Sequence, residues 1–406
     1  MLADQPLAIS DTLLPQTSDL PLSGPVRIRR VDTYVHRAPI ARPVLTSFGE
    51  MRDRPAVLIR VEDHDGAHGW GEVWCNYPAC GAEHRARLLD SVIAPRLIGA
   101  RYDNVPEATR DLEASVRVLA IQTAEWGPLA QVLAGLDIAL WDLSARRANT
   151  PLARLLGASG SRISVPAYAS GINPEDAAQT IRAFRQAGYG AFKIKVGFGL
   201  ERDTRALSAA RDELSAGERL MIDANQAWNL DTALEMSRVL AEFSPQWLEE
   251  PMTADTGLAD WHRLAADSPI PIAGGENLRG VEAFSRAMDS GVMQVIQPDM
   301  CKWGGVTGCL PVARAIRASG KLYCPHFLGA GIGLMASAQL LAAVGGDGLL
   351  EVDSNPNPLR QSLATPFPEL DGNGCFTIPQ QPGLGVEPDL NASRQWQVAH
   401  YHCTGG

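Results

Sequence analysis

The sequence predicts an α/β protein in which a barrel of alternating strands and helices follows a smaller α+β domain. The barrel is predicted because short apolar runs alternate with helix-like segments over residues 164–353, and an ionisable residue closes nearly every run. Successive ionisable residues are roughly 23 to 30 positions apart, about the length of one strand-plus-helix unit. Strand-like and then helical patterns before residue 151 predict the smaller domain.

The first domain is expected over residues 26–150. Residues 1–25 lack a basic leader and a continuous apolar core, so we expect a disordered tail rather than a signal peptide. VRIRRVDTYVHR and PAVLIRVEDHDG have strand patterns, whereas GWGEVWCNYPACGAEH is rich in glycine and aromatic residues and predicts a loop over a binding site. Helical periodicity then marks ARLLDSVIAPRLIG, PLAQVLAGLDIALWDLSARRA and PLARLLG.

Residues 151–360 are expected to form the barrel. Its predicted strands are ISVPAYAS, AFKIKV, RLMIDAN, QWLEEP, PIAGGEN, MQVIQPDM, KLYCPHF and GLLEVD. Residues 361–406, which contain CFTIPQ among many Pro, Gly and Asn residues, are expected to return to the first domain. Catalytic groups of such barrels lie where the strands end, so we expect the site there.

The composition excludes several classes of protein. The net charge of −10 argues against a nucleic-acid partner, and no apolar stretch approaches the roughly 18 residues of a membrane span. An apolar fraction of 45% with 20% charged residues is typical of a folded globular protein. The seven cysteines are odd in number and lack zinc-type pairs, so we expect free thiols in a cytoplasmic protein.

Three acidic residues would lie at the ends of adjacent strands: Asp223, Glu249 and Glu276. Carboxylates without a nearby cysteine are the ligands that Mg²⁺ prefers, so they predict a magnesium site rather than a zinc site. Strand alternation sends Glu249 and Glu250 to opposite faces. Asn225 shares the face of Asp223 and is either a substrate contact or a structural hydrogen-bonding residue.

Basic residues would lie around the same mouth. The spacing of Lys193 and Lys195 places both on one side of a strand, and a lysine acts as a base only if burial or positive charge lowers its pKa. A divalent ion and the second lysine would both act in that direction. Asp299 and His326 close consecutive strands, where an aspartate would fix the tautomer of the histidine base. Glu351 would either donate a hydrogen bond, if protonated, or form a salt bridge.

Together these groups are suited to removing a proton α to a carboxylate. The dianionic enolate that forms must be stabilised, and Mg²⁺, Lys193 and Glu351 would supply that stabilisation. Lys195 and His326 would act on opposite faces of the carbon. The expected partner is therefore a small carboxylate.

At these residues the chain resembles the enolase superfamily, and specifically its mandelate racemase subgroup. The resemblance is carried by FKIKVG, MIDANQAW, WLEEP, GGEN, PDMCKWGGVTG, PHF, LLEVD and LAGLDIALWDLSAR. It implies a modified (β/α)₇β barrel beneath an α+β capping domain, and a homo-oligomer. It also implies, as metal ligands, Asp223, Glu249 and Glu276. The implied bases are Lys195 and the His326–Asp299 pair, with electrophilic help from Lys193 and Glu351.

The same resemblance implies that capping-domain loops select the substrate, here over residues 46–54 and 74–84. They hold Arg52, Arg54, Trp74, Asn76 and Tyr77, which indicate a polar or anionic distal group, although surface positions for the arginines are equally open. Lys193, Asn225, Trp74, Arg52 and Glu351 are the expected substrate contacts. Dehydration of an acid sugar is the favoured reaction; racemisation or epimerisation of a 2-hydroxy acid and cycloisomerisation of a sugar lactone are alternatives on the same residues.

A rival enzyme class is an NAD-dependent dehydrogenase. GAGIGLMA places Gly331, Gly333 and Ala336 after a strand, with Glu351 at about the spacing of a dinucleotide fingerprint. That reading leaves the strand-end groups upstream without a role, so it is the remote alternative. Magnesium dependence would separate the two classes.

Overall fold

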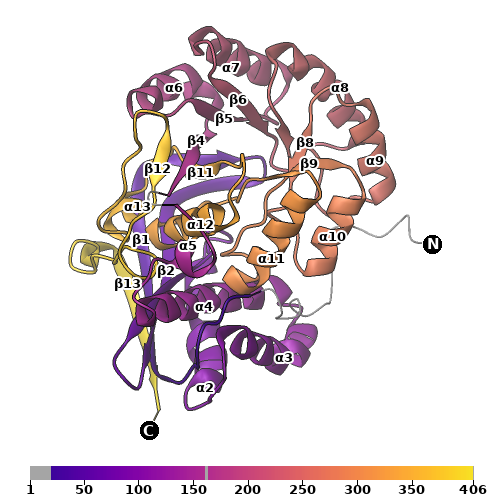
Figure 1. The fold of residues 1–406 in the computed structure, drawn as a ribbon. Coiled ribbons are helices and arrows are strands. Elements are labelled where there is room, and N and C mark those ends of the chain that lie inside the picture. The colour runs from indigo at the N-terminus through magenta and orange to yellow at the C-terminus, as the bar shows by residue number, and fades with distance from the viewer. Residues whose placement is uncertain (1–19, 161–162, 406) are drawn as a thin grey trace.

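The computed structural model describes residues 20–160 and 163–405, which form a capping domain and a barrel (Figure 1). The predicted tail falls for the most part on residues 1–19, outside the described residues. Its last part is not loose, because Ser23 is buried and its Oγ accepts a hydrogen bond from the Val105 amide at 2.8 Å. No helix among the described residues is long and apolar enough to cross a membrane.

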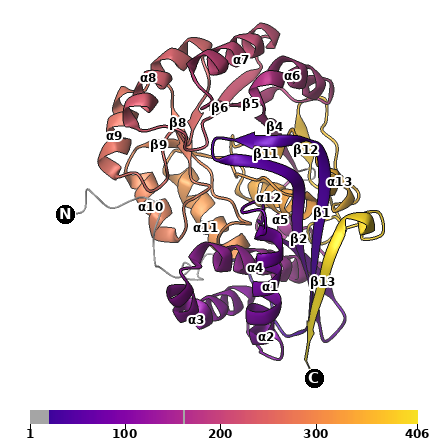
Figure 2. The ribbon, with the colours of Figure 1, turned by 180° about the vertical axis from the view of Figure 1, so that it is seen from behind.

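The capping domain contains a four-stranded antiparallel sheet in the order β13-β1-β2-β3. Its strands are β1 (Ile28–Thr46), β2 (Gly49–Asp63), β3 (His68–Val73) and β13 (Gln397–Thr404). Its helices are α1 (Gly81–Leu88), the π-helical η2 (Leu89–Ile93), α2 (Ala94–Leu97), α3 (Val105–Thr123), α4 (Trp126–Arg147) and α5 (Leu152–Leu155). The long hairpin of β1 and β2 extends from the cap towards the barrel (Figure 2).

The barrel is TIM-like, with parallel strands in the order β11-β4-β5-β6-β7-β8-β9-β10. The strands are β4 (Ser164–Ile172), β5 (Ala191–Lys195), β6 (Arg219–Asp223), β7 (Leu248–Glu249), β8 (Ile272–Gly274), β9 (Met293–Ile296), β10 (Leu322–Tyr323) and β11 (Leu350–Asp353). The intervening helices are α6 (Ala177–Gln186), α7 (Leu200–Glu213), α8 (Leu230–Leu240), α9 (Leu258–Asp267), α10 (Val281–Asp289), α11 (Gly305–Ala318) and α12 (Gly331–Val344). Each strand from β4 to β10 is followed by a helix and β11 is last, so the predicted (β/α)₇β barrel is confirmed.

Short elements complete the chain. They are η3 (Pro174–Asp176), η4 (Ala241–Phe243), α13 (Pro358–Ser362), β12 (Cys375–Thr377) and η5 (Arg394–Trp396). The C-terminal segment was expected to return to the cap, and its two strands divide between the cap and the barrel. β12, within the predicted CFTIPQ, pairs antiparallel with β4 of the barrel, and only β13 pairs with β1 of the cap.

The predicted loop GWGEVWCNYPACGAEH is wrong in its first part, because Gly69–Val73 belong to strand β3. The glycines of this segment allow β3 to pack closely on α4 and do not form a loop. A Cβ on Gly71 would lie 2.0 Å from the carbonyl oxygen of Gly135 in α4, and one on Gly69 would lie 2.2 Å from that of Ala139. Backbone therefore packs directly on backbone where β3 crosses α4.

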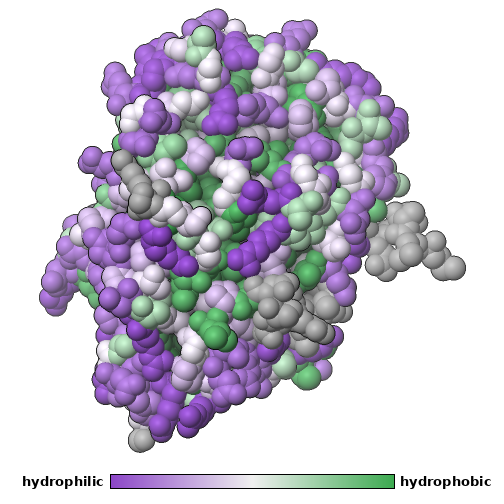
Figure 3. Space-filling model, in the orientation of Figure 1, coloured by the Kyte–Doolittle hydropathy of each residue, from purple (hydrophilic) through white to green (hydrophobic). Residues whose placement is uncertain are grey.

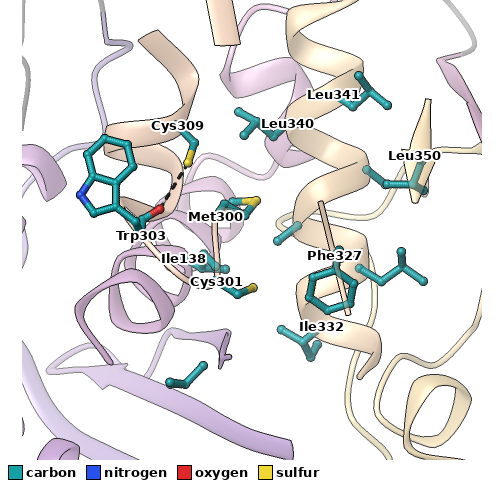
Figure 4. Close-up of a cluster of buried hydrophobic side chains, with 14 of the residues drawn as sticks. Ile138, Met300, Cys301, Trp303, Cys309, Phe327, Ile332, Leu340, Leu341 and Leu350 are labelled. Carbon is teal, nitrogen blue, oxygen red and sulfur yellow. Dashed lines mark hydrogen bonds between the residues drawn. The ribbon is translucent and has the colours of Figure 1, made fainter. Parts of the chain in front are cut away.

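Helix α4 joins the cap to the barrel through both polar and apolar contacts. Buried Asp137 accepts hydrogen bonds from the amide of Thr307 at 3.0 Å and from its hydroxyl at 2.5 Å, at the beginning of α11. A carboxylate at a helix N-terminus satisfies free amides and is favoured by the helix dipole. Ile138 packs beside Met300, Cys301 and other buried barrel residues (Figure 4). Outside this core, hydrophilic residues predominate on the face drawn in Figure 3.

Candidate active site

The inner face of the barrel is built in layers, as strand alternation requires. One buried apolar layer takes a residue from each strand region: Tyr168, Ala191, Met221, Trp247, Ala273, Val295, Cys324 and Leu349. The residues two positions further along are Ser170, Lys193, Asp223, Glu249, Gly275, Gln297, His326 and Glu351. A polar layer therefore lies directly above the apolar one, at the carboxyl ends of the strands.

Lys193 is buried in the polar layer between two carboxylates. Its Nζ lies 2.5 Å from Oε1 of Glu249 and 2.7 Å from Oε1 of Glu351. Burial lowers the pKa of Lys193, but the charges of these carboxylates outweigh burial and hold that pKa well above its usual value. Lys193 is therefore a fixed positive charge in this arrangement.

Glu351 forms a salt bridge rather than acting as a protonated donor. Burial raises its pKa, but Lys193 and His326 lower it to about 2, so the carboxyl is ionised at neutral pH. It also accepts hydrogen bonds from the Ser170 hydroxyl and, at 2.9 Å, from the Phe327 amide. Of the two predicted possibilities for Glu351, the structure thus favours the salt bridge.

Lys195 lies nearer the mouth and is held by two oxygen atoms. Its Nζ donates to Oδ2 of Asp223 at 2.7 Å and to Oδ1 of Asn225 at 2.6 Å. Burial and the charge of Lys193 lower the pKa of Lys195, yet the charge of Asp223 leaves it above its usual value. The lowering by the second lysine is present, as predicted, but the charge of Asp223, whose Oδ2 lies 2.7 Å from Nζ, outweighs it.

His326 joins two acidic residues. Its Nδ1 lies 2.7 Å from Oδ2 of Asp299, and its Nε2 lies 2.9 Å from Oε2 of Glu276. Burial lowers the pKa of His326, but Glu276, Glu351 and Asp299 raise it well above the usual value. The structure therefore brings together the predicted Asp–His pair and places a charged imidazole against Glu276.

The three predicted metal ligands, Asp223, Glu249 and Glu276, supply oxygen donors of the kind that Mg²⁺ takes. Each of them pairs with a nitrogen of a lysine or histidine, on Lys195, Lys193 and His326 respectively. Among the described residues, no group of three or more His, Cys, Asp or Glu side chains is already gathered to hold a metal ion. The donor chemistry fits magnesium, and shared binding of one ion would require these side chains to turn from their present partners.

Glu250 follows Glu249 but has a different environment. Its Oε1 accepts a hydrogen bond from Asn277 at 2.8 Å, whereas Oε2 of Glu249 accepts one from Gln297 at 2.6 Å inside the barrel. Burial and the charges of Glu276 and Asp223 raise the pKa of Glu250 well above its usual value. The two side chains thus face different ways, as the alternation argument predicted, and only Glu249 belongs to the inner polar layer.

The cap reaches the site through its first hairpin and through the loop after β3. Ser47 donates a hydrogen bond to the carbonyl oxygen of Asn225 at 2.5 Å. Lys302 Nζ lies 4.8 Å from the ring centre of Trp74, and Asn76 donates to the carbonyl of Leu328 at 2.6 Å. Trp74 therefore lies against the Lys302 ammonium group, and its contact with a substrate stays a prediction.

The two arginines of the predicted substrate loop have different positions. Arg52 is exposed at the surface, where its guanidinium pairs with Glu50, so the expectation that it contacts substrate is not supported. Arg54 is buried and its Nη2 lies 2.5 Å from Oδ2 of Asp353 on β11. The two arginines are two positions apart in β2, so strand alternation puts them on the same face. The docking of the cap against β11 decides which of them is buried.

Several residues at the site were missed in the sequence. Lys302 donates to Oε1 of Glu276 at 3.1 Å and to Asn277 at 2.7 Å, and Gln297 and Ser170 hold the carboxylates of Glu249 and Glu351. For Gln297 and Ser170 the signal was available, because both lie two residues beyond the apolar layer. Lys302 follows Asp299 in a loop, where the two-residue alternation of a strand gives no prediction of which way a side chain points.

The dinucleotide reading of GAGIGLMA is not supported. The segment does begin helix α12, but Glu72 of the cap occupies its N-terminus, with hydrogen bonds from the amides of Ala330 at 2.5 Å and Gly333 at 2.8 Å. Burial raises the pKa of Glu72 to about 7. A pyrophosphate would need these amides, so the glycines serve the docking of the cap.

Comparisons with known proteins agree with this architecture. The N-terminal domain model of mandelate racemase / muconate lactonizing enzyme matches residues 29–157, and the enolase C-terminal domain-like model matches residues 175–392. The chain is 31% identical over 389 residues to a D-galactarolactone cycloisomerase of Agrobacterium fabrum, covering 92% of this chain and 99% of the relative.

Solved structures also resemble this chain. A mandelate racemase/muconate lactonizing enzyme from Bordetella bronchiseptica is 52% identical with a TM-score of 0.84, covering 91% of this chain and 99% of that one. The L-talarate/galactarate dehydratase of Salmonella typhimurium, solved with Mg and L-lyxarohydroxamate, is 27% identical with a TM-score of 0.79, covering 94% and 95%. Relatives of this chain include dehydratases, cycloisomerases and racemases. This chain therefore belongs to the mandelate racemase/muconate lactonizing enzyme family of the enolase superfamily.

Proposed function

We propose that this enzyme removes the α-proton of an acid sugar with the help of Mg²⁺ and that loss of water follows. The observation that carries the proposal is the position of two proton-bearing groups beside the predicted metal ligands: Lys195 contacts Asp223, and His326 contacts Glu276. The Salmonella relative, which is named as a dehydratase and was solved with Mg, supports both the reaction and the ion.

Three carboxylates at or just beyond the ends of β6, β7 and β8 would hold the ion: Asp223, Glu249 and Glu276. Mg²⁺, when bound there, supplies positive charge that favours both the developing anion and the neutral form of Lys195. Lys193, fixed between Glu249 and Glu351, keeps a positive charge beside the substrate carboxylate.

The proton steps fall to Lys195 and His326. The α-proton passes to the neutral form of one of them, and the electrons of the C–H bond form the enolate. His326 in its charged form then donates a proton to the β-hydroxyl oxygen, which leaves as water while the C–O bond breaks. Asp299 stabilises that charged imidazole through its contact with Nδ1.

A second candidate is the cycloisomerisation of a sugar lactone, which the Agrobacterium relative favours because the similarity spans nearly its whole length. The same α-proton would be removed, but the ring oxygen would leave instead of water. Mass spectrometry separates the reactions, since dehydration lowers the mass of the product by one water. Cycloisomerisation and racemisation leave the mass unchanged.

The experiment is a screen of acid sugars and their lactones with Mg²⁺ in D₂O, followed by NMR and mass spectrometry. We expect a dehydrated product, formation of which stops when the ion is chelated and resumes when Mg²⁺ is restored. Deuterium exchange or inversion without loss of water would refute dehydration. Full turnover after exhaustive chelation would refute the metal-assisted reaction altogether.

Matched variants test the two proton carriers. Lys195→Ala and His326→Asn should each lower turnover by about 100-fold or more, the usual contribution of a general acid or base. Lys321→Gln and His262→Asn are the controls. Lys321 binds the Met293 carbonyl before β10, at the opposite end of the barrel, and His262 is exposed on α9. Full activity in either site variant would contradict its assigned role.

A further inference from the structure

The guanidinium of Arg54 has only part of its hydrogen-bonding capacity used. Its Nη2 pairs with Oδ2 of Asp353 at 2.5 Å, while the buried Nη1 has no hydrogen-bond partner among the described residues. Arg54 is 1% exposed, so its charge is almost fully removed from solvent. Buried charged donors normally find acceptors, so a free nitrogen here points to an acceptor that this chain does not provide.

Asp353 cannot serve both nitrogens of the guanidinium. Its other oxygen, Oδ1, accepts hydrogen bonds from the Asn355 amide at 3.0 Å and from the Asn355 side chain at 2.9 Å. Arg54 is therefore held in place through one nitrogen, and the other has no acceptor among the described residues. An arginine fork of this kind matches the two oxygens of a carboxylate.

The position of Arg54 relates it to the reaction site. Asp353 lies two residues beyond Glu351 on β11, on the same inward face, and pairs in register with Ser170 of β4. Ser170 in turn donates to Glu351, which binds Lys193. Arg54, which belongs to the cap, thus contacts the barrel one layer above the Lys193–Glu351 pair.

Other donors of the cap are also without acceptors. Among the described residues, the buried Nε1 of Trp74 and the hydroxyl of Tyr77 have no hydrogen-bond partner. Trp74 lies over Lys302, which binds Glu276. Donors without acceptors in the cap, one of them over the Lys302–Glu276 pair, favour a ligand that carries several oxygen atoms.

We propose that Arg54 binds the second carboxylate of a diacid sugar, at the end of the substrate away from the carbon that loses its proton. This inference rests on the proposed function and narrows its substrate class from acid sugars to diacids. Asp353 acts as a positioning residue, because it fixes the guanidinium without touching the ligand. Monoacid sugars of the same configuration lack the group that Arg54 would bind.

The test compares each diacid sugar with the monoacid of the same configuration, using kcat and KM measured with Mg²⁺. The wild-type enzyme should prefer the diacid. Arg54→Gln should raise KM for the diacid by about 10- to 100-fold, the range expected for a hydrogen bond to a charged group. KM for the monoacid should change by less than about threefold. Arg60→Gln, further along β2 and paired with Glu62 at 2.7 Å, is the matched control.

Equal losses for both substrates in Arg54→Gln would overturn the proposal, because they would show that Arg54 only ties the cap to the barrel. Arg54→Lys keeps a charge opposite Asp353 but lacks the fork, so a reduced diacid preference in that variant supports the proposal even if Arg54→Gln does not fold. Wild-type turnover of monoacids but not diacids would overturn it while leaving the proposed function intact. Absence of α-proton exchange with every acid sugar would refute both.

Discussion

His36 offers a test of how far burial alone lowers the pKa of a histidine. It lies on β1 between Ala56 of β2 and Gln397 of β13, and its side chain is fully buried. Neither ring nitrogen has a hydrogen-bond partner among the described residues. Burial lowers the pKa of His36 from 6.5 to about 4, because the charged imidazolium would lose its hydration without gaining a partner.

The direction of the pH effect follows from proton linkage. Between about pH 6.5 and pH 4 the unfolded chain binds the proton at His36 and the folded chain does not, so stability falls as the pH falls through this window. With the two pKa values above, the loss between about pH 7.5 and pH 5 is about 2 kcal/mol. His36→Leu removes the titrating group at similar volume and should remove that loss.

Urea unfolding of wild type and His36→Leu at both pH values measures the difference. The wild type should lose about 2 kcal/mol more than the variant on acidification. The variant should also equal or exceed the wild type at about pH 7.5, since it buries no unpartnered nitrogen. His262→Leu, at an exposed position on α9, is the control. It should lose as much stability on acidification as the wild type does. Equal acid losses in wild type and His36→Leu would refute the reasoning.

Three further changes test the docking of the cap and the proton-transfer pair. Gly71→Ala should prevent β3 from packing on α4 and yield unstable or insoluble protein, whereas Gly127→Ala, which meets no atom within 4 Å, should fold with an unchanged melting temperature or a higher one. Glu72→Ala leaves two amides of α12 without their acceptor and should lower the free energy of unfolding by about 2 to 4 kcal/mol in urea titrations. Asp299→Asn should reduce kcat by about 100-fold or more, because His326 loses the partner that stabilises its charged form; an unchanged kcat would exclude that role.

The sequence by itself determined the barrel and most of the polar layer. Both follow from local rules: strands and helices repeat at a fixed length, and alternate residues of a strand face the same side. Lys193, Asp223, Glu249 and Glu351 could therefore be assigned to one mouth without coordinates. Ser170 and Gln297 obey the same rule and were missed because neither is ionisable.

Only the tertiary structure decided which groups touch, and with what charge. Glycines read as loop formers are contact points between β3 and α4, and the glycine-rich start of α12 binds Glu72 rather than a nucleotide. Arg52 and Arg54 look alike in the sequence, yet one is exposed and the other is buried against Asp353. Partners of this kind are brought together from distant parts of the chain, and the pKa of a buried group depends on charges a few ångströms away, so no local pattern encodes either.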